Sequence, residues 1–315
     1  MPYQPAERPT LYFIGVTTAK SSIMRVFPEW ARHLGLGDAA IRGIDFPLHA
    51  DAASYREAVA FIREDPLSRG ALVTTHKIDL FQACRDMFDR IDPHAAAMGE
   101  VSCISKRGSA LVCHAKDPIS SGLAMREFLP DGYFSRSRAE VFLMGAGGST
   151  IAISWHLTQE SKGRDVPSRI VVSNRSPGRL DHIRQFHREI GMRVPVEYGL
   201  ARSPGDNDAI LARLAPGSLV VNATGLGKDA PGSPLTAASE FPLDGIAWDL
   251  NYRGDLVFLE QARVQAERRR LRVADGWTYF LHGWTQVISE VFEVAIPTSG
   301  PEFDALSRIA ATARV

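Results

Sequence analysis

Short apolar runs alternate with helix-periodic segments along most of the chain. Runs such as LYFIGV, GALVTT and IVVSN are each followed by a segment whose apolar residues recur three and four positions apart. The first pattern is typical of buried strands and the second of amphipathic helices. Strands that alternate with helices form parallel sheets, because a parallel connection needs a crossover helix. The sequence therefore predicts an α/β fold.

The length predicts more than one domain. A chain of 315 residues exceeds the roughly 100–200 residues that one domain usually holds. We expect an N-terminal α/β domain over residues 1–120 and a dinucleotide-binding domain over 121–275. The C-terminal helices, 276–315, are expected to pack back on the first domain.

Three local features make more specific predictions. The segment IMRVFPEWARHLGL reads as a helix that Pro28 starts or breaks, since proline removes a backbone donor. The segment GEVSCISKRGSALVCHAKD reads as two short strands joined by a Lys-Arg-Gly turn. The segment LVFLEQARVQAERRR reads as one helix.

Composition excludes several classes of partner. Lys plus Arg and Asp plus Glu both number 36, so nothing indicates a nucleic-acid partner. No apolar run approaches the ~18 residues of a membrane span, and the N-terminus lacks the apolar stretch of a leader peptide. Cys84, Cys103 and Cys113 have no metal-ligand spacing. Their odd, low number favours a reducing compartment. We therefore expect a cytoplasmic protein without a metal.

The stretch VFLMGAGGST is the most specific local signal. A strand runs into a glycine turn, and a helix follows. Such a turn lets the backbone approach a pyrophosphate, and the helix N-terminus then offers unpaired N–H groups. Thr150 occupies the third glycine position of the usual pattern, and Ser149 and Thr150 are expected to cap the helix or bind phosphate. The predicted phosphate-binding residues are Gly145, Ala146, Gly147, Gly148 and Ser149.

The next strand end bears on the choice of cofactor. An acidic residue there binds the ribose hydroxyl of NAD, whereas an arginine suits the 2′-phosphate of NADP. The segment IVVSNRSPGR offers Arg175 and Arg179 and no acid before Asp181. Two ordinary surface arginines are the plainer alternative, but cations are disfavoured at a helix start. We therefore expect NADP rather than NAD, bound here by Asn174, Arg175, Ser176 and Arg179.

A second small-residue loop, VVNATGLG, ends another buried strand. At the carboxyl edge of the sheet it would lie beside the nicotinamide half of the cofactor. The remaining predicted cofactor-binding residues are Asn222, Ala223, Thr224 and Gly276.

Nine motifs in order resemble one family along nearly the whole chain. They are FIGVTTAKSS, GALVTTHK, GEVSCI, HAKD, LMGAGGST, SNRSPGR, VNATGLG, DLNY and DGWTYFLHGWTQ. The chain resembles the shikimate dehydrogenases, including the quinate/shikimate dehydrogenases. The resemblance implies a substrate domain, a Rossmann-type NADP domain and an active site between them. It also implies reversible hydride transfer between nicotinamide and a ring alcohol or ketone.

The resemblance implies a catalytic lysine and aspartate, which are Lys77 and Asp117 here. The match at Lys77 requires one residue fewer before it, where only His76 stands. A ketone that is reduced needs a proton donor, and burial would lower a lysine pKa toward the working range while a nearby carboxylate restrains the fall. Asp117 would orient the ammonium and accept a hydroxyl hydrogen bond. His76 and His114 remain rival acid–base groups.

The substrate contacts depart from the family pattern. Ile23 stands where the family has a second serine, with Ser22 beside it and Lys20 in place of a histidine. Ser102, Cys103 and Ala115 replace an asparagine, a threonine and an asparagine, and Gly283 replaces a glutamine. Gln286 lies three positions on, near the same helix face. The predicted substrate-binding residues are Ser21, Ser22, Thr74, Ser102, Tyr252 and Gln286.

These losses predict a changed substrate. A polar group left unpaired costs about 1–3 kcal/mol, so a site that loses amides discriminates differently. The sequence favours an NADP-dependent oxidoreductase acting on a small cyclic hydroxy-acid or keto-acid other than shikimate. A genuine shikimate or quinate dehydrogenase stays open, as does an NADP(H)-binding sensor without turnover. The substrate, the reaction direction and the assembly, with a homodimer among the options, are not determined.

Overall fold

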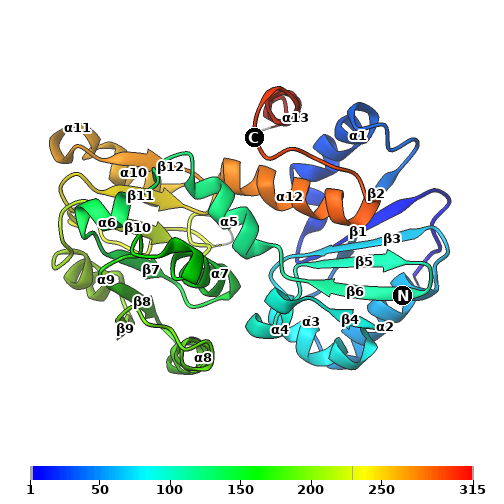
Figure 1. Cartoon of the computed structure of the whole chain (residues 1–315), viewed down its shortest axis with the longest axis horizontal. Coiled ribbons are helices and arrows are strands. Elements are labelled where there is room, and N and C mark those ends of the chain that lie inside the picture. Colours follow the sequence, from blue (N-terminus) through cyan, green and yellow to red (C-terminus); the bar gives the residue numbers. More distant parts are fainter. Residues whose placement is uncertain (1–2, 229, 314–315) are drawn as a thin grey trace. The chain divides into compact units, whose positions relative to one another are not determined.

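The computed structural model describes residues 3–228 and 230–313. Its internal contacts divide the chain into two compact units, shown in sequence colours in Figure 1. Unit 1 comprises the residues up to 117 and those from 281 on, and unit 2 comprises residues 118–280. From the sequence we placed the divisions at 120 and 276.

Unit 1 contains a mixed six-stranded sheet in the order β2-β1-β3-β5-β6-β4. Its strands are β1 (Thr10–Gly15), β2 (Ala40–Asp45), β3 (Ser68–Val73), β4 (Arg90–Ile91), β5 (Cys103–Arg107) and β6 (Ala110–His114). Strand β1 pairs in parallel with β2 and β3, whereas β5 is antiparallel to β3 and β6. The predicted pair of short strands is thus confirmed as a hairpin. The sheet of unit 1 is therefore mixed and not entirely parallel, because a tight turn joins antiparallel strands.

Helices cover both faces of this sheet, as Figure 1 shows. The Tyr12 ring meets Phe61 with centroids 5.3 Å apart, and the Phe13 ring, on the other face of β1, meets Trp284 at 4.9 Å. Every residue of β1 is therefore buried, which explains its unbroken apolar sequence. The helices of unit 1 are α1 (Ile23–His33), α2 (Ala52–Glu64), α3 (Lys77–Cys84), α4 (Pro93–Met98), α13 (Pro301–Ala311) and the later part of α12 (Trp277–Phe292), with 3₁₀ turns at Thr18–Lys20 and Arg85–Met87.

Helix α1 corrects one prediction and confirms another. It runs unbroken from Ile23 to His33, with Pro28 inside it, so the proline neither starts nor breaks the helix. The buried Phe27 and Trp30 of α1 belong to the core of unit 1, and this packing offsets the lost backbone hydrogen bond. The Trp30 indole donates to the Leu306 carbonyl of α13 at 2.9 Å, so the C-terminal helices pack back on the first domain as expected.

Unit 2 contains six parallel strands in the order β12-β11-β10-β7-β8-β9. This is the doubly wound order of dinucleotide-binding folds, whose ligands bind where the order reverses, here between β7 and β10. The strands are β7 (Val141–Met144), β8 (Ile170–Asn174), β9 (Val196–Leu200), β10 (Leu219–Asn222), β11 (Ile246–Asp249) and β12 (Arg272–Ala274).

The helices of unit 2 pack on an apolar sheet. On one face Phe142, Val220 and Ala247 share a core with Ile210 of α9 and Phe258 of α10. The predicted single helix after β11 is two short helices, because the chain leaves the helix at Val264 and Gln265, where the Gln265 side chain binds Phe241 N–H and Ser239 C=O. The helices are α5 (Asp117–Met125), α6 (Tyr133–Ser137), α7 (Gly148–Leu157), α8 (Pro177–Glu189), α9 (Pro204–Leu211), α10 (Val257–Arg263) and α11 (Ala266–Arg269), with a 3₁₀ turn at Glu160–Lys162.

Two further findings concern the described part of the chain. None of its helices is both long and apolar enough to cross a bilayer. Its three cysteines are buried free thiols, and within the same residues no group of three or more His, Cys, Asp and Glu could hold a metal ion.

Candidate active site and cofactor site

The structure brings Lys77 and Asp117 together within unit 1. Lys77 is the first residue of α3, just beyond β3, and Asp117 is the first residue of α5, just beyond β6. The Lys77 ammonium donates a hydrogen bond to the Asp117 carboxylate, and the two side chains are only 16% and 11% exposed. The pair is therefore a largely buried ion pair, held at the ends of two strands of one sheet.

The turn before Lys77 is tight and strained. Thr75 has φ +62°, a left-handed conformation that is rare for a β-branched residue. The His76 N–H donates to the Thr74 carbonyl at 2.6 Å, which closes the turn. The left-handed conformation of Thr75 thus lets a short turn connect β3 to Lys77. A strained backbone conformation of this kind persists only where the surrounding structure stabilises it.

A third ionisable group, Glu100, belongs to this site and was missed from the sequence. Its side chain is fully buried, and both carboxyl oxygens lack a hydrogen-bond partner among the described residues. Burial raises the pKa of Glu100 to about 7; the Lys77 charge works against this rise and the Asp117 charge adds to it. The signal in the sequence was an acid inside the otherwise apolar start of GEVSCI.

The protonation state of Lys77 differs from our expectation. Burial lowers the pKa of Lys77, but the charges of Asp117 and Glu100 outweigh burial, so its pKa is raised. We expected a net fall toward the working range, which is wrong because two carboxyl groups, and not one, face the ammonium. Lys77 is therefore a stable cation at neutral pH.

The two histidines next to the pair are bonded elsewhere. The buried His76 ring lies 2.8 Å from the Tyr55 hydroxyl through Nδ1, and burial lowers its pKa, so it is neutral at pH 7. The His114 Nε2 lies 2.8 Å from the Ser105 hydroxyl, and its Nδ1 lies 3.3 Å from Asp92. The contacts found for these rings do not include Lys77 or Asp117.

The predicted substrate-binding residues fall in both units. Ser102 is buried, and its hydroxyl accepts the Lys116 N–H at 2.7 Å, so it braces the turn before Asp117. Ser22 is also buried and precedes α1, and Ile23 lies wholly in the core. Tyr252 belongs to unit 2, where its ring packs on Phe280 with centroids 4.7 Å apart. Of the others, Ser21, Thr74 and Gln286 are partly exposed residues of unit 1.

The glycine turn of unit 2 has the shape that a pyrophosphate site requires. Gly145 has φ +108°, and a Cβ there would lie 2.5 Å from the Ala223 carbonyl oxygen, so only glycine fits. Gly147 precedes α7, and a Cβ at this position would meet nothing within 4 Å. Thr150 is buried and donates to the Gly145 carbonyl at 2.8 Å. It thus closes the turn and is not free for phosphate, whereas Gly147 leaves open space before the helix N-terminus.

Two arginines mark the end of β8. Arg175 is exposed and Arg179 is partly exposed, and within the described residues no ion pair of either guanidinium is found. Ser176 caps α8, and the Asn174 side chain accepts the Ser176 N–H at 2.8 Å. The Ser176 and Asn174 side chains thus bind backbone groups of their own turn, while the guanidinium groups of Arg175 and Arg179 remain available for an anion.

The loop after β10 is built around a buried asparagine. The Asn222 side chain accepts from the Thr224 hydroxyl at 2.7 Å and donates to Asp249 at 3.1 Å. Ala223 donates its N–H to the Met144 carbonyl at 2.8 Å, which ties this loop to the glycine turn. Gly276 packs on backbone, since a Cβ there would lie 2.0 Å from the Leu250 carbonyl oxygen.

Asp249, at the end of β11, is a second buried acid that the sequence reading did not single out. It is fully buried, and its Oδ2 has no partner in the described structure. Its Oδ1 accepts the Asn251 N–H at 2.9 Å. Burial is the main cause that raises the pKa of Asp249 to about 7.

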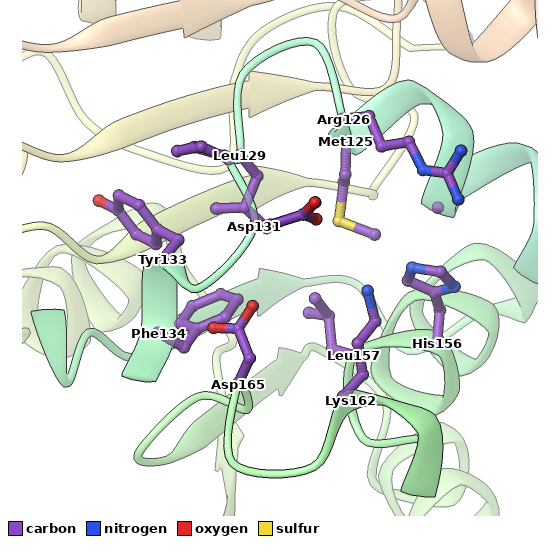
Figure 2. Close-up of a pocket in the computed structure, with 12 residues that line it drawn as sticks. Met125, Arg126, Leu129, Asp131, Tyr133, Phe134, His156, Leu157, Lys162 and Asp165 are labelled. Atoms are coloured by element: carbon purple, nitrogen blue, oxygen red, sulfur yellow. The ribbon is translucent and has the colours of Figure 1, made fainter. Parts of the chain in front are cut away.

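A pocket in unit 2 lies away from the predicted cofactor residues. Figure 2 shows Arg126, His156 and Lys162 around it, with Met125 between them. His156 is near the last residue of α7, whereas the glycine turn precedes the first, and ligands of such folds bind at the carboxyl ends of the strands. Burial and the two nearby cations lower the pKa of His156 to about 4. This pocket is therefore not the dinucleotide site.

The chain is similar in sequence to known shikimate dehydrogenases. No protein-family model matches it. It is 27% identical over 299 residues to a shikimate dehydrogenase (NADP(+)) of Sphingopyxis alaskensis, covering 94% of this chain and 95% of that protein. It is 29% and 30% identical, over 173 and 176 residues, to proteins of the same name from Methanothrix thermoacetophila and Methanopyrus kandleri. The chain spans about half the length of these two relatives, 55% of each.

Solved structures share the fold over almost the whole chain. A shikimate 5-dehydrogenase of Thermus thermophilus in complex with NADP(H) and shikimate matches with a TM-score of 0.68 and 22% identity, covering 96% of this chain and 99% of that one. A quinate dehydrogenase of Corynebacterium glutamicum in complex with NAD matches with a TM-score of 0.72 and 19% identity, covering 97% and 99%. The chain is thus similar along almost its whole length to a shikimate dehydrogenase (NADP(+)), and it shares the fold of solved shikimate and quinate dehydrogenases.

Proposed function

We propose that the protein is an NADP-dependent oxidoreductase that transfers a hydride between nicotinamide and a small cyclic hydroxy-acid or its keto form. The observation that carries this proposal is the largely buried Lys77–Asp117 ion pair. Burying two charges is costly unless they are paired, and a protein that only binds a nucleotide has no need of such a pair in its other unit. The relatives named shikimate dehydrogenase (NADP(+)) support the same reaction class.

The residues of unit 2 fit NADP. The open space at Gly147 and the N-terminus of α7 suit the pyrophosphate. Arg175 and Arg179 suit the 2′-phosphate, because guanidinium groups bind phosphate with two parallel hydrogen bonds. When bound, the cofactor supplies or accepts the hydride. The reading as NADP and not NAD rests on these two arginines and on the relatives' names.

The proton chemistry falls to Lys77 and Asp117. The raised pKa of Lys77 keeps it an ammonium, which suits donation of a proton to the oxygen of a ketone as that oxygen gains negative charge. Asp117 fixes the ammonium and accepts a hydrogen bond from the product hydroxyl. In the oxidative direction the alcohol proton returns to the same pair. The arrangement therefore favours ketone reduction at neutral pH.

We further propose that the substrate is not simply shikimate. Ala115 is fully buried and Ile23 lies in the core, so neither offers a polar group to a substrate. Gly283 has no side chain, and a Cβ there would meet nothing within 4 Å. Each hydroxyl left without its partner costs about 1–3 kcal/mol. We expect shikimate to react with a kcat/KM well below that for the true substrate.

The Lys77→Ala variant tests the mechanism. We expect NADPH to bind as before, because Lys77 lies in the other unit, and turnover of the keto substrate to fall roughly 10²–10⁴-fold, the usual contribution of a positioned acid. The measurement is NADPH oxidation with a panel of cyclic keto-acids, together with NADPH binding by fluorescence. Lys106→Ala, in strand β5 of the same unit, is the matched control and should keep the wild-type kcat.

The substrate panel separates the alternatives. Turnover of shikimate or quinate with a kcat/KM above every other acid would identify an ordinary dehydrogenase with compensating contacts, for which Gln286 is the candidate. NADPH binding without oxidation or reduction of any acid in the panel would favour a sensor protein. Unchanged turnover in Lys77→Ala would exclude the proposed acid.

A further inference from the structure

Glu100 is the buried ionisable group that the proposed reaction does not yet use. It follows Gly99, the left-handed residue that ends α4, and precedes strand β5. Its carboxyl group is sealed from solvent and receives no hydrogen bond from the described residues. An ionised carboxylate without donors is strongly disfavoured in such a place. A buried acid without hydrogen-bond donors calls for a chemical explanation.

Backbone hydrogen bonds tie the segment just after Glu100 to the two elements that carry the ion pair. The next residue, Val101, donates its N–H to the Lys77 carbonyl at 3.1 Å. The residue after that, Ser102, donates its N–H to the His114 carbonyl at 2.9 Å, and its hydroxyl accepts the Lys116 N–H at 2.7 Å. The segment that carries Glu100 is therefore tied on one side to the start of α3 and on the other to the turn before Asp117.

The three groups together are electrically neutral when one of the two acids holds a proton, and Glu100 is the acid whose oxygens receive no hydrogen bond from the described residues, whereas Asp117 accepts one from Lys77. Lys77 carries one positive charge and Asp117 one negative charge, so the pair is neutral when Glu100 holds a proton. Ionisation of Glu100 would place a second negative charge beside the ammonium in a site with little water, where charges interact strongly. A cation that faces two carboxylates gives up its proton less readily than one that faces a single carboxylate.

We propose that Glu100 is a positioning residue of the proposed reaction: its protonated carboxyl keeps the Lys77–Asp117 pair balanced, and its ionisation makes Lys77 a poorer proton donor. This inference rests on the proposed function, since it concerns the acid that the reaction uses. The groups that face Glu100 are Lys77 of α3 and Asp117 of α5, and the nearby Cys113 thiol of β6 has a pKa raised by burial and stays neutral. Because the pKa of Glu100 is raised to about 7, the change falls in the range of ordinary assays.

The decisive experiment compares the pH profiles of the wild type and Glu100→Gln. Glutamine has nearly the same shape and cannot ionise, so it mimics the protonated acid. We expect similar kcat values for ketone reduction at pH 6, and a wild-type kcat that falls about tenfold between pH 6.5 and 8.5. The variant should hold its rate over this interval. If folding of Glu100→Gln is impaired, Glu100→Met, also uncharged and similar in volume, gives the same readout.

A second measurement does not depend on turnover. Infrared difference spectra between pH 5.5 and 8.5 should contain the carbonyl band of a protonated carboxyl that titrates near pH 7. Asp249 is expected to contribute a similar band, so the comparison is made between Asp249→Asn and the double variant with Glu100→Gln. The band should be present in the first and absent from the second.

The outcomes separate the inference from the proposed function. Identical pH profiles in the wild type and Glu100→Gln, or a band that survives in the double variant, would overturn the role of Glu100 even if the enzyme is active. An absence of turnover with every keto-acid would overturn the proposed function, and the infrared band would still decide whether Glu100 holds the proton. A loss of kcat that is equal at all pH values would show a merely structural role.

Discussion

Lys77 is governed by its neighbours more than by its burial. Burial alone lowers a lysine pKa, and from the sequence we expected such a fall. Asp117 and Glu100 reverse it, so the pKa is raised. The lysine was identified from its place in an ordered set of motifs. Its protonation state required knowledge of which acids lie beside it, and Glu100 is 23 positions away along the chain.

Arg175 and Arg179 carry the prediction of cofactor choice. With both changed to alanine, we expect the affinity for NADPH to fall roughly 10–100-fold, because each arginine offers a charged, bidentate contact to phosphate. The affinity for NADH should stay within about twofold, since NADH lacks the 2′-phosphate. The measurement is fluorescence titration with both cofactors.

The control for this prediction is Arg184→Ala, which lies further along α8. Arg184 is already paired with Asp181, so its removal should leave both affinities unchanged. Equal losses of NADPH and NADH affinity in the double variant would contradict a role in recognising the 2′-phosphate.

At the scale of elements, the candidate residues lie where strands pass into helices. Lys77 and Asp117 each begin a helix, Gly145–Gly148 follow β7, and Asn174–Ser176 lie at the end of β8. The N-terminus of a helix favours an anion and disfavours a cation, so Asp117 is well placed at α5 while Lys77 at α3 needs its carboxylates. The turn geometry, including the left-handed Thr75, decides where each side chain lies.

Alanine substitutions at two glycines of the same turn are expected to affect different properties: Gly145→Ala mainly stability and Gly147→Ala mainly NADPH affinity. Gly145→Ala should destabilise the protein by about 1–3 kcal/mol, because alanine would be strained at φ +108° and would clash with the Ala223 carbonyl. Gly147→Ala should cost less, up to about 1 kcal/mol for a poorer N-cap, since its φ is −97° and the space is open. It should nevertheless lower NADPH affinity about tenfold or more if the pyrophosphate lies against it.

Urea unfolding and NADPH titration of the two variants give both quantities. The prediction fails if Gly147→Ala binds NADPH like the wild type, because the pyrophosphate would then not lie in the open space beside Gly147. A neutral effect of Gly145→Ala on stability would contradict the close approach of Ala223.

At the scale of the whole molecule, each unit buries one carboxyl group whose pKa is raised to about 7. These are Glu100, ordinarily near 4.5, and Asp249, ordinarily near 3.8. Because the folded protein holds these protons more tightly than the unfolded chain, their contribution is fully present below the ordinary values and is lost as pH rises through about 7. We expect stability to fall between pH 5 and 7 by on the order of 1 kcal/mol per pH unit for each group.

Asp249→Asn tests this in unit 2. Asparagine can keep the hydrogen bond from the Asn251 N–H and cannot ionise, so the variant should gain stability over the wild type at pH 8 and gain little at pH 4. Urea midpoints followed by fluorescence of the adjacent, buried Trp248 measure the difference. Asp255→Asn, an exposed acid of the same unit, should show no such pH dependence.

Much of the fold could be predicted because its signals are local. Buried strands of the parallel sheet read as unbroken apolar runs, and the glycine turn after β7 is a short motif. Strand β9 was not predicted, since its residues are partly exposed and its pattern is weak. The hairpin of β5 and β6 was recognised, but its insertion beside β3, which makes the sheet of unit 1 mixed, depends on pairing between distant segments.

The sequence by itself determined the α/β class, the order of the motifs and the residue types at the candidate site. Only the tertiary structure decided that Lys77 and Asp117 form a buried pair, that Thr150 closes its own turn, and that Glu100 faces the ammonium. The reason is physical: propensity and periodicity act over a few residues along the chain. Burial and charge depend on which distant segments the fold brings together.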